Sequence, residues 1–386
     1  MINKVNLFIS PNKVIFGSGT AEMVGAEAEQ FGAKKALIVT DKGVMKADLL
    51  AGVQDSLKAR KINFEVFDQV EAEPPARNID DGAKLAVSTG ADIVIGVGGG
   101  SSLDVAKGIA IMAKQKGKVV DFAGRDKVPG SGLPKILLPT TAGTGSEVTR
   151  TIVFIDEAEN VKAAIHSNYA LADVAIVDPL LTLSMPLKVT ADTGVDAMIH
   201  AIEAYASLNA TPFSEITALE AIRLIAENLP AAYAKAENIT ARANMSLAAT
   251  LAGLALNSAG AAAIHGLSNI MGLKYKMSHG RANAVLLPYV IDYNKIGDLN
   301  RYATIAQAVG IDTEGLSPYE ASEELVAYLF NLLEILNIPA SLSDYGATEA
   351  DIPALVEGGM KLARLFIPNP RNMTEEDVRN IYTSAL

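Results

Sequence analysis

Short apolar, β-branched runs alternate with amphipathic segments through the first half of the chain. This alternation is typical of βαβ units and a parallel sheet. The runs predicted as buried strands are 36–40, 63–67, 92–97, 136–139, 151–155 and 174–178, and the predicted helices include 43–59, 77–89 and 102–115. The pattern therefore predicts an α/β domain over residues 1–187.

From about residue 188 the strand pattern stops, and apolar residues recur at helical spacing almost to the end, for example in 213–229 and 243–259. Residues 188–386 are therefore predicted to form an all-helical domain. Pro179 and Pro186 mark the junction, where the chain has no Ser/Gly-rich linker. Because a flexible linker is missing, we expect the two halves to pack tightly and to share a cleft.

Composition excludes several classes of protein. Of the 386 residues, 49% are hydrophobic and 20% charged, which suits a folded chain with sizeable cores. A net charge of −11 argues against a nucleic-acid partner. No run reaches the roughly 18 apolar residues of a membrane helix, and the N-terminal stretch, with its turn at Pro11-Asn12, does not resemble a signal peptide. The lack of cysteine excludes disulfides and thiolate sites, so we expect a soluble cytoplasmic protein without a membrane partner.

Three of the four histidines form a pattern with one aspartate. Asp196 and His200 are four residues apart in a helix-like stretch, and therefore share a helical face. His265 and His279 follow, fourteen residues apart. One carboxylate and three imidazoles suit a divalent metal such as Fe²⁺ or Zn²⁺, although unrelated histidines on apolar helices would give the same pattern. The fourth histidine, His166, is expected to have a surface or loop role.

Two Gly-rich segments follow predicted strands. Residues 98–102, GGGSS, lie between a strand and a helix, where backbone amides and the helix dipole favour a phosphate. Ser101 or Ser102 could cap that helix, and an ordinary tight turn is the alternative. Residues 139–147, PTTAGTGSE, offer hydroxyls and amides for a pyrophosphate or ribose. Asp41 ends another strand; there it could accept from a ribose hydroxyl, thus favouring NAD over NADP, or cap the helix that follows.

Taken together, these segments resemble the iron-dependent (group III) alcohol dehydrogenase family over essentially the whole chain. The motifs are GGGSSLDVAK (98–107), PTTAGTGSEVTR (139–150), ADVAIVDP (172–179), TGVDAMIHAIEAY (193–205), HGLSN (265–269), HGRANAVLLP (279–288) and NPR (369–371). The resemblance implies a dehydroquinate synthase-like architecture, with an N-terminal NAD-binding domain and a C-terminal metal-binding domain between which NAD and Fe²⁺ meet. It also implies a homodimer or higher homo-oligomer.

The resemblance implies reversible hydride transfer between NAD(H) and a small primary alcohol or aldehyde polarised by Fe²⁺, with Zn²⁺ as a possible substitute. It assigns the metal ligands to Asp196, His200, His265 and His279, and the cofactor contacts to Asp41, Gly99, Gly100, Ser101, Thr140, Thr141, Thr149, Lys162 and Leu181. The alternatives are an NAD- and zinc-dependent polyol dehydrogenase or cyclase of the same architecture, and a non-catalytic NAD-binding relative.

The chain departs from the family pattern at two positions. Asn269 stands where the family usually has a second histidine, four residues after the third ligand, which implies a role in proton transfer or substrate contact there. An amide cannot act as a general acid or base, so the proton is expected to leave through ribose hydroxyls or water, or Asn269 binds the substrate. Glu73 replaces a common Asn near the adenosine.

Overall fold

The computed structural model describes residues 5–159 and 161–386. The chain divides into two compact units, Ser10–Met185 and Pro186–Leu386, and residues 5–9 group with the second unit. Within that second unit the Ile9 carbonyl accepts a hydrogen bond from Asn257 Nδ2 at 2.7 Å.

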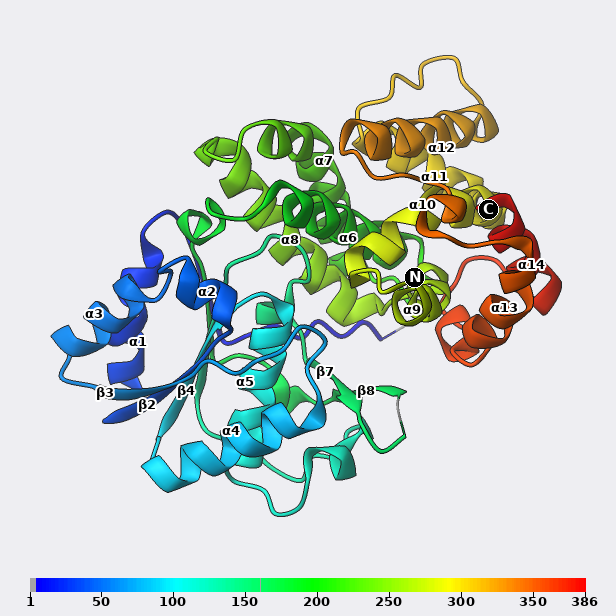
Figure 1. Cartoon of the computed structure of the whole chain (residues 1–386). Helices are drawn as coiled ribbons and strands as arrows, with labels where there is room; N and C mark the ends of the chain where they lie inside the picture. Colours follow the sequence, from blue (N-terminus) through cyan, green and yellow to red (C-terminus); the bar gives the residue numbers. More distant parts are fainter. Residues whose placement is uncertain (1–4, 160) are drawn as a thin grey trace. The chain divides into compact units, whose positions relative to one another are not determined.

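The first unit is built on a six-stranded parallel sheet in the order β1-β9-β6-β4-β2-β3. Figure 1 labels three neighbouring strands of this sheet, β3, β2 and β4. Its strands are β1 (Lys13–Phe16), β2 (Lys35–Val39), β3 (Asn63–Phe67), β4 (Ile93–Gly98), β6 (Lys135–Pro139) and β9 (Val174–Val177). Its helices are α1 (Val24–Gln30), α2 (Lys42–Lys46), α3 (Ala51–Ala59), α4 (Ala76–Thr89) and α5 (Gly100–Met112). The predicted α/β fold class is confirmed.

Two hydrophobic cores cover opposite faces of this sheet. Side chains alternate along a strand, so Leu37 of β2 packs with Ile79 of α4 and Ile109 of α5 in one core. The next residue, Ile38, belongs to the other core, with Val53 of α3. Burial on both faces explains why these strands are continuous apolar runs in the sequence.

Two local predictions were wrong in part. The strand predicted at 151–155 does form, as β7 (Thr151–Asp156), but it lies outside the parallel sheet. It pairs antiparallel with β8 (Val161–His166), a strand that the sequence did not reveal, in a small sheet completed by β5 (Gly124–Arg125). The helix predicted at 43–59 is split into α2 and α3 because Asp48 adopts a left-handed conformation, with φ of 53°.

Among the described residues of the second unit, all regular secondary structure is helical, as predicted. The α-helices are α6 (Leu187–Ala206), α7 (Pro212–Ala234), α8 (Ile239–Ala259), α9 (Ala263–Tyr275), α10 (His279–Asn294), α11 (Leu299–Ala308), α12 (Pro318–Ile335), α13 (Ile352–Met360) and α14 (Glu375–Ser384). Helices α6, α7 and α8 pack against one another. Helix α8 is long and apolar enough to cross a membrane by composition, but 56% of its most apolar window is buried, as in an ordinary core helix.

Candidate metal and dinucleotide sites

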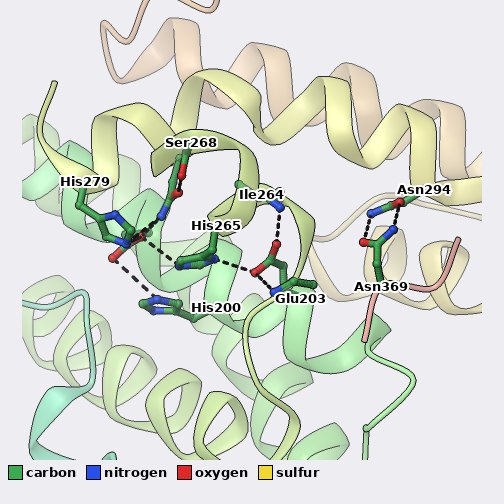
Figure 2. A network of polar contacts seen from close by, with 11 residues as sticks. His200, Glu203, Ile264, His265, Ser268, His279, Asn294 and Asn369 are labelled. Carbon is green, nitrogen blue, oxygen red and sulfur yellow. Dashed lines mark hydrogen bonds and ion pairs between the residues drawn. The ribbon is translucent and has the colours of Figure 1, made fainter. Parts of the chain in front are cut away.

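Three imidazoles from three helices of the second unit, those of His200, His265 and His279, converge around one carboxylate (Figure 2). Asp196 and His200 lie on consecutive turns of α6, His265 lies in the first turn of α9, and His279 is the first residue of α10. The Nε2 atoms of His265 and His279 lie 4.0 and 3.9 Å from Asp196 Oδ1. His200 Nε2 lies 3.9 Å from Asp196 Oδ2. The three imidazole nitrogens therefore all lie within 4.0 Å of the Asp196 carboxylate, two near Oδ1 and that of His200 near Oδ2.

A glycine allows α10 to begin against α6. A Cβ atom on Gly280 would lie 2.3 Å from the backbone oxygen of Asp192, which is too close for any side chain. The Asp192 carboxylate strengthens this contact, because it pairs with Arg281 at 2.6 Å and accepts a hydrogen bond from Ser278 Oγ at 2.7 Å. His279 is thus held between two residues that are both anchored on α6.

The electrostatics of the cluster suit a cation. Asp196 is almost completely buried, and burial on its own raises the pKa of its carboxyl group. The three facing imidazoles, when protonated, and a hydrogen bond from the Asn283 amide outweigh burial and lower this pKa to about 2. Ligand atoms of Asp196, His265 and His279 all lie within 4.8 Å of one another. A carboxylate and imidazole nitrogens at this spacing fit a divalent metal ion.

Residues that the sequence analysis did not identify support the ligands. Glu203 Oε2 lies 2.7 Å from His265 Nδ1, and Asn283 Nδ2 donates to Asp196 Oδ1 at 2.8 Å. Ser268 Oγ donates to Asn283 Oδ1 (Figure 2). The sequence did contain a signal for both residues. Glu203 comes seven residues after Asp196, and Asn283 four after His279, so each lies on the same helical face as a candidate ligand.

Asn269 lies on α9 four residues after His265, and therefore on the same face of that helix. Its side chain is half-buried, and among the described residues it makes no hydrogen bond. The amide is thus available to a ligand.

In the first unit, the loops after neighbouring parallel strands meet at one edge of the sheet. Asp41 follows β2 and Gly99 follows β4, at the point where the strand order reverses. Open α/β sheets bind ligands at such a point. Asp41 caps α2, with Oδ1 accepting from the Gly43 and Val44 amides at 2.8 and 3.1 Å. Its Oδ2 accepts from Ser102 Oγ at 2.9 Å, so Asp41 does cap the helix, and one lone pair, on Oδ2, is left for a further donor.

The glycine loop after β4 opens α5. Its N-cap is Gly99, and no side-chain oxygen caps the helix within the described chain, so the prediction that Ser101 or Ser102 does so was wrong. Ser102 bonds Asp41 instead. The amides of the first turn, including those of Gly100 and Ser101, are therefore left for another acceptor such as a phosphate.

The loop after β6 lies against this glycine loop. The Thr140 amide donates to the Gly98 carbonyl at 3.0 Å, and the Cβ of a residue at Gly100 would come within 2.7 Å of Thr144 Cγ2. Thr141 lies in ordinary contact with Gly99, because a Cβ there would meet Thr141 Cγ2 at 3.5 Å. Two of the predicted cofactor segments are therefore adjacent.

The remaining predicted contacts lie elsewhere in this unit. Thr149 is buried, and its hydroxyl lies 3.4 Å from the fully buried ammonium of Lys107. Lys162, on β8, pairs with Glu73 at 3.2 Å. Leu181 packs into the core beside the sheet. The structure thus brings Asp41, the glycine loop and Thr140-Thr141 together, and leaves the other three residues in separate surroundings.

His166 lies outside both clusters. It ends β8, where its Nδ1 is 3.1 Å from Thr151 Oγ1.

Both halves of the chain are similar to known proteins. The chain matches the family described as iron-containing alcohol dehydrogenase over residues 11–179, and the C-terminal part of the Fe-containing alcohol dehydrogenase family over residues 190–386. It is 40% identical to the 1,3-propanediol dehydrogenase of Citrobacter freundii, over 98% of each chain. It is 36% identical to the NAD-dependent methanol dehydrogenase of Bacillus methanolicus, over 99% of this chain and 100% of the other. A crystal structure of 1,3-propanediol oxidoreductase superposes with a TM-score of 0.97 at 38% identity, covering 99% of this chain and 100% of that one.

Proposed function

This chain belongs to the iron-containing alcohol dehydrogenase family, and we propose that it interconverts a small primary alcohol and its aldehyde by hydride exchange with NAD(H). It is an oxidoreductase of the alcohol dehydrogenase class. The similarity to alcohol dehydrogenases over both halves of the chain does not favour a polyol dehydrogenase, a cyclase or a non-catalytic relative.

The observation that carries the proposal is the convergence of Asp196 with the imidazoles of His200, His265 and His279 on three helices. These four side chains would hold the metal ion, Fe²⁺ in the proposal and Zn²⁺ as the alternative. When bound, the ion would supply Lewis acidity to the alcohol or carbonyl oxygen.

For the cofactor, we propose that the loops after β2, β4 and β6 bind NAD(H). The open first turn of α5 would accept the pyrophosphate, and Asp41 a ribose hydroxyl. The other proposed contacts are Thr149, Lys162 and Leu181. Because Glu73 already pairs with Lys162, that lysine would contribute less charge to the cofactor than an unpaired one.

Asn269 is proposed to contact the substrate or to lie beside the path of its proton. Because an amide does not titrate, the proton would leave through ribose hydroxyls or water. Asn269→His should then change the dependence of kcat on pH while the metal content is preserved. An unchanged pH profile would show that this position is not on the proton route.

The direct test is oxidation of NADH, followed at 340 nm, by anaerobically purified protein reconstituted with Fe²⁺ or with Zn²⁺. The aldehyde panel should include formaldehyde and 3-hydroxypropanal, since the relatives are named for methanol and 1,3-propanediol. His265→Ala should abolish turnover. His166→Ala is the matched control, because it removes a histidine outside the cluster. No turnover by the wild-type protein with either ion, despite NADH binding, would refute the proposal.

We also propose a two-domain division at about residue 187, a cytoplasmic location and a homodimer. The two compact units, Ser10–Met185 and Pro186–Leu386 with residues 5–9, support the division. The absence of cysteine is compatible with a reducing compartment. Light scattering during size-exclusion chromatography would test the dimer, and a monomeric mass would refute it.

A further inference from the structure

A buried glutamate links two of the helices that carry the candidate ligands. Glu203 lies on α6, one turn after His200, and is 5% exposed. Its Oε2 lies 2.7 Å from His265 Nδ1 and accepts from the Ala262 amide at 2.8 Å. Its Oε1 accepts from the Ile264 amide at 2.7 Å. All three partners belong to the start of α9, as Figure 2 shows for Ile264 and His265.

Two of these hydrogen bonds replace a missing helix cap. Helix α9 begins at Ala263, and the N-cap residue, Ala262, has no side-chain oxygen to accept from the first-turn amides. Glu203 supplies that acceptor from another helix, and its negative charge lies at the positive end of the α9 dipole. The start of α9, where His265 lies, is therefore positioned by α6, which also carries Asp196 and His200.

The third hydrogen bond determines the chemistry of the imidazole. An ionised carboxylate only accepts hydrogen bonds, so Nδ1 of His265 must carry a proton to bond Glu203. In the neutral ring this leaves the lone pair on Nε2, the atom that faces Asp196 Oδ1 at 4.0 Å. Metal-ligating histidines commonly depend on such a partner for their tautomer and ring orientation.

We infer that Glu203 is a positioning residue for the metal ion, which selects the Nε2-ligating tautomer of His265 and docks α9 onto α6. The inference rests on the proposed metal site. A residue that served only as a helix cap would affect the stability of the fold without a specific effect on metal affinity. The two roles therefore differ in a measurable way.

Glu203→Gln separates these roles because it preserves size and removes charge. Its amide has one acceptor oxygen and one NH₂ group, so at least one of the three N–H donors must face another donor. The control variant is Asn369→Ala. Asn369 forms a buried amide pair with Asn294, at 2.8 and 2.7 Å, and contacts no candidate ligand, so its loss should destabilise the same unit without touching the metal (Figure 2).

The experiment is a titration of the metal-free full-length protein with Co²⁺ and Zn²⁺ against a chromophoric chelator, with thermal unfolding measured in parallel. We expect Glu203→Gln to weaken metal binding by about 10- to 100-fold and to alter the visible Co²⁺ spectrum. Asn369→Ala should lower Tm and retain wild-type affinity. If Glu203→Gln does not fold, Glu203→Asp replaces it. This variant keeps the charge but shortens the reach to His265, and it too should bind metal more weakly.

Different failures have different meanings. If the wild-type protein binds neither ion, the proposed metal site is wrong, and this inference falls with it. If the wild-type protein binds but Glu203→Gln, or Glu203→Asp in its place, matches its affinity within twofold, only the role of Glu203 is refuted. If Asn369→Ala loses metal affinity in proportion to its fall in Tm, a specific role for Glu203 is likewise refuted.

Discussion

The contact between α10 and α6 makes Gly280→Ala a sharp test of how the candidate metal site is held. Gly280 follows His279 directly, and an added Cβ would lie 2.3 Å from the backbone oxygen of Asp192. A backbone oxygen inside a helix cannot rotate away as a side chain can. The start of α10 must therefore move away from α6, carrying His279 with it.

The size of the effect follows from this distance. Relieving the contact to the 3.0 Å that real Cβ atoms respect requires a shift of about 0.7 Å. Functional constellations tolerate displacements of only about 0.5 Å, and a misplacement of about 1 Å can lower a rate by about 100-fold. Overpacking of this kind also costs about 1–3 kcal/mol of stability. We expect a loss of NADH-linked turnover of about 10- to 100-fold, and weaker metal binding.

The assay compares turnover, Co²⁺ affinity and Tm with those of a matched control, Gly272→Ala. Gly272 lies on the neighbouring helix α9, and its added Cβ would meet only the Met277 carbonyl oxygen, at an ordinary 3.5 Å. That variant should bind metal normally and gain up to about 1 kcal/mol from better helix propensity. If Gly280→Ala keeps wild-type turnover and metal affinity, the close approach of the two helices does not position His279.

Two further predictions concern charge. In the metal-free protein the folded pKa of Asp196, about 2, lies below its ordinary value of 3.8. While the facing imidazoles are protonated, its ionisation therefore contributes about 2 kcal/mol of stability at pH 4, which is lost as pH falls towards 2. In urea unfolding, the stability that Asp196→Asn loses relative to the wild-type protein should shrink between pH 4 and pH 2, and a constant loss would contradict this prediction. At the cofactor site, Asp41→Ser keeps a capping oxygen but removes the charge, so kcat/KM with NADPH should rise relative to NADH. An unchanged ratio would mean that Asp41 does not face the ribose.

Much of this protein was predictable from local patterns in its sequence. Continuous apolar runs indicated strands buried on both faces, and the change to helical spacing near residue 188 indicated the all-helical part; both agree with the structure. Asp196 and His200 were predicted to share a helical face because their spacing is local, and they do. That these residues bind a metal, and that Asp41 binds a ribose, stay predictions.

The tertiary structure decided what depends on contacts between distant segments. The β7 run has the composition of a sheet strand, yet only pairing with β8 determined that it lies outside the parallel sheet. Asp48 breaks a helix that apolar spacing alone predicted as continuous. The convergence of His265 and His279 on Asp196 depends on how α9 and α10 dock onto α6.

The residues that support the candidate ligands show most clearly that contacts between distant segments are not predictable from the sequence. In the sequence, Glu203 is one more polar residue in an apolar helical stretch, and Asn283 is an ordinary amide. Their roles appear only when segments about 60 and 87 residues away, respectively, are brought within hydrogen-bond distance. Spacing along one helix is determined by local geometry, whereas partners on different helices are determined by burial and packing of the whole unit.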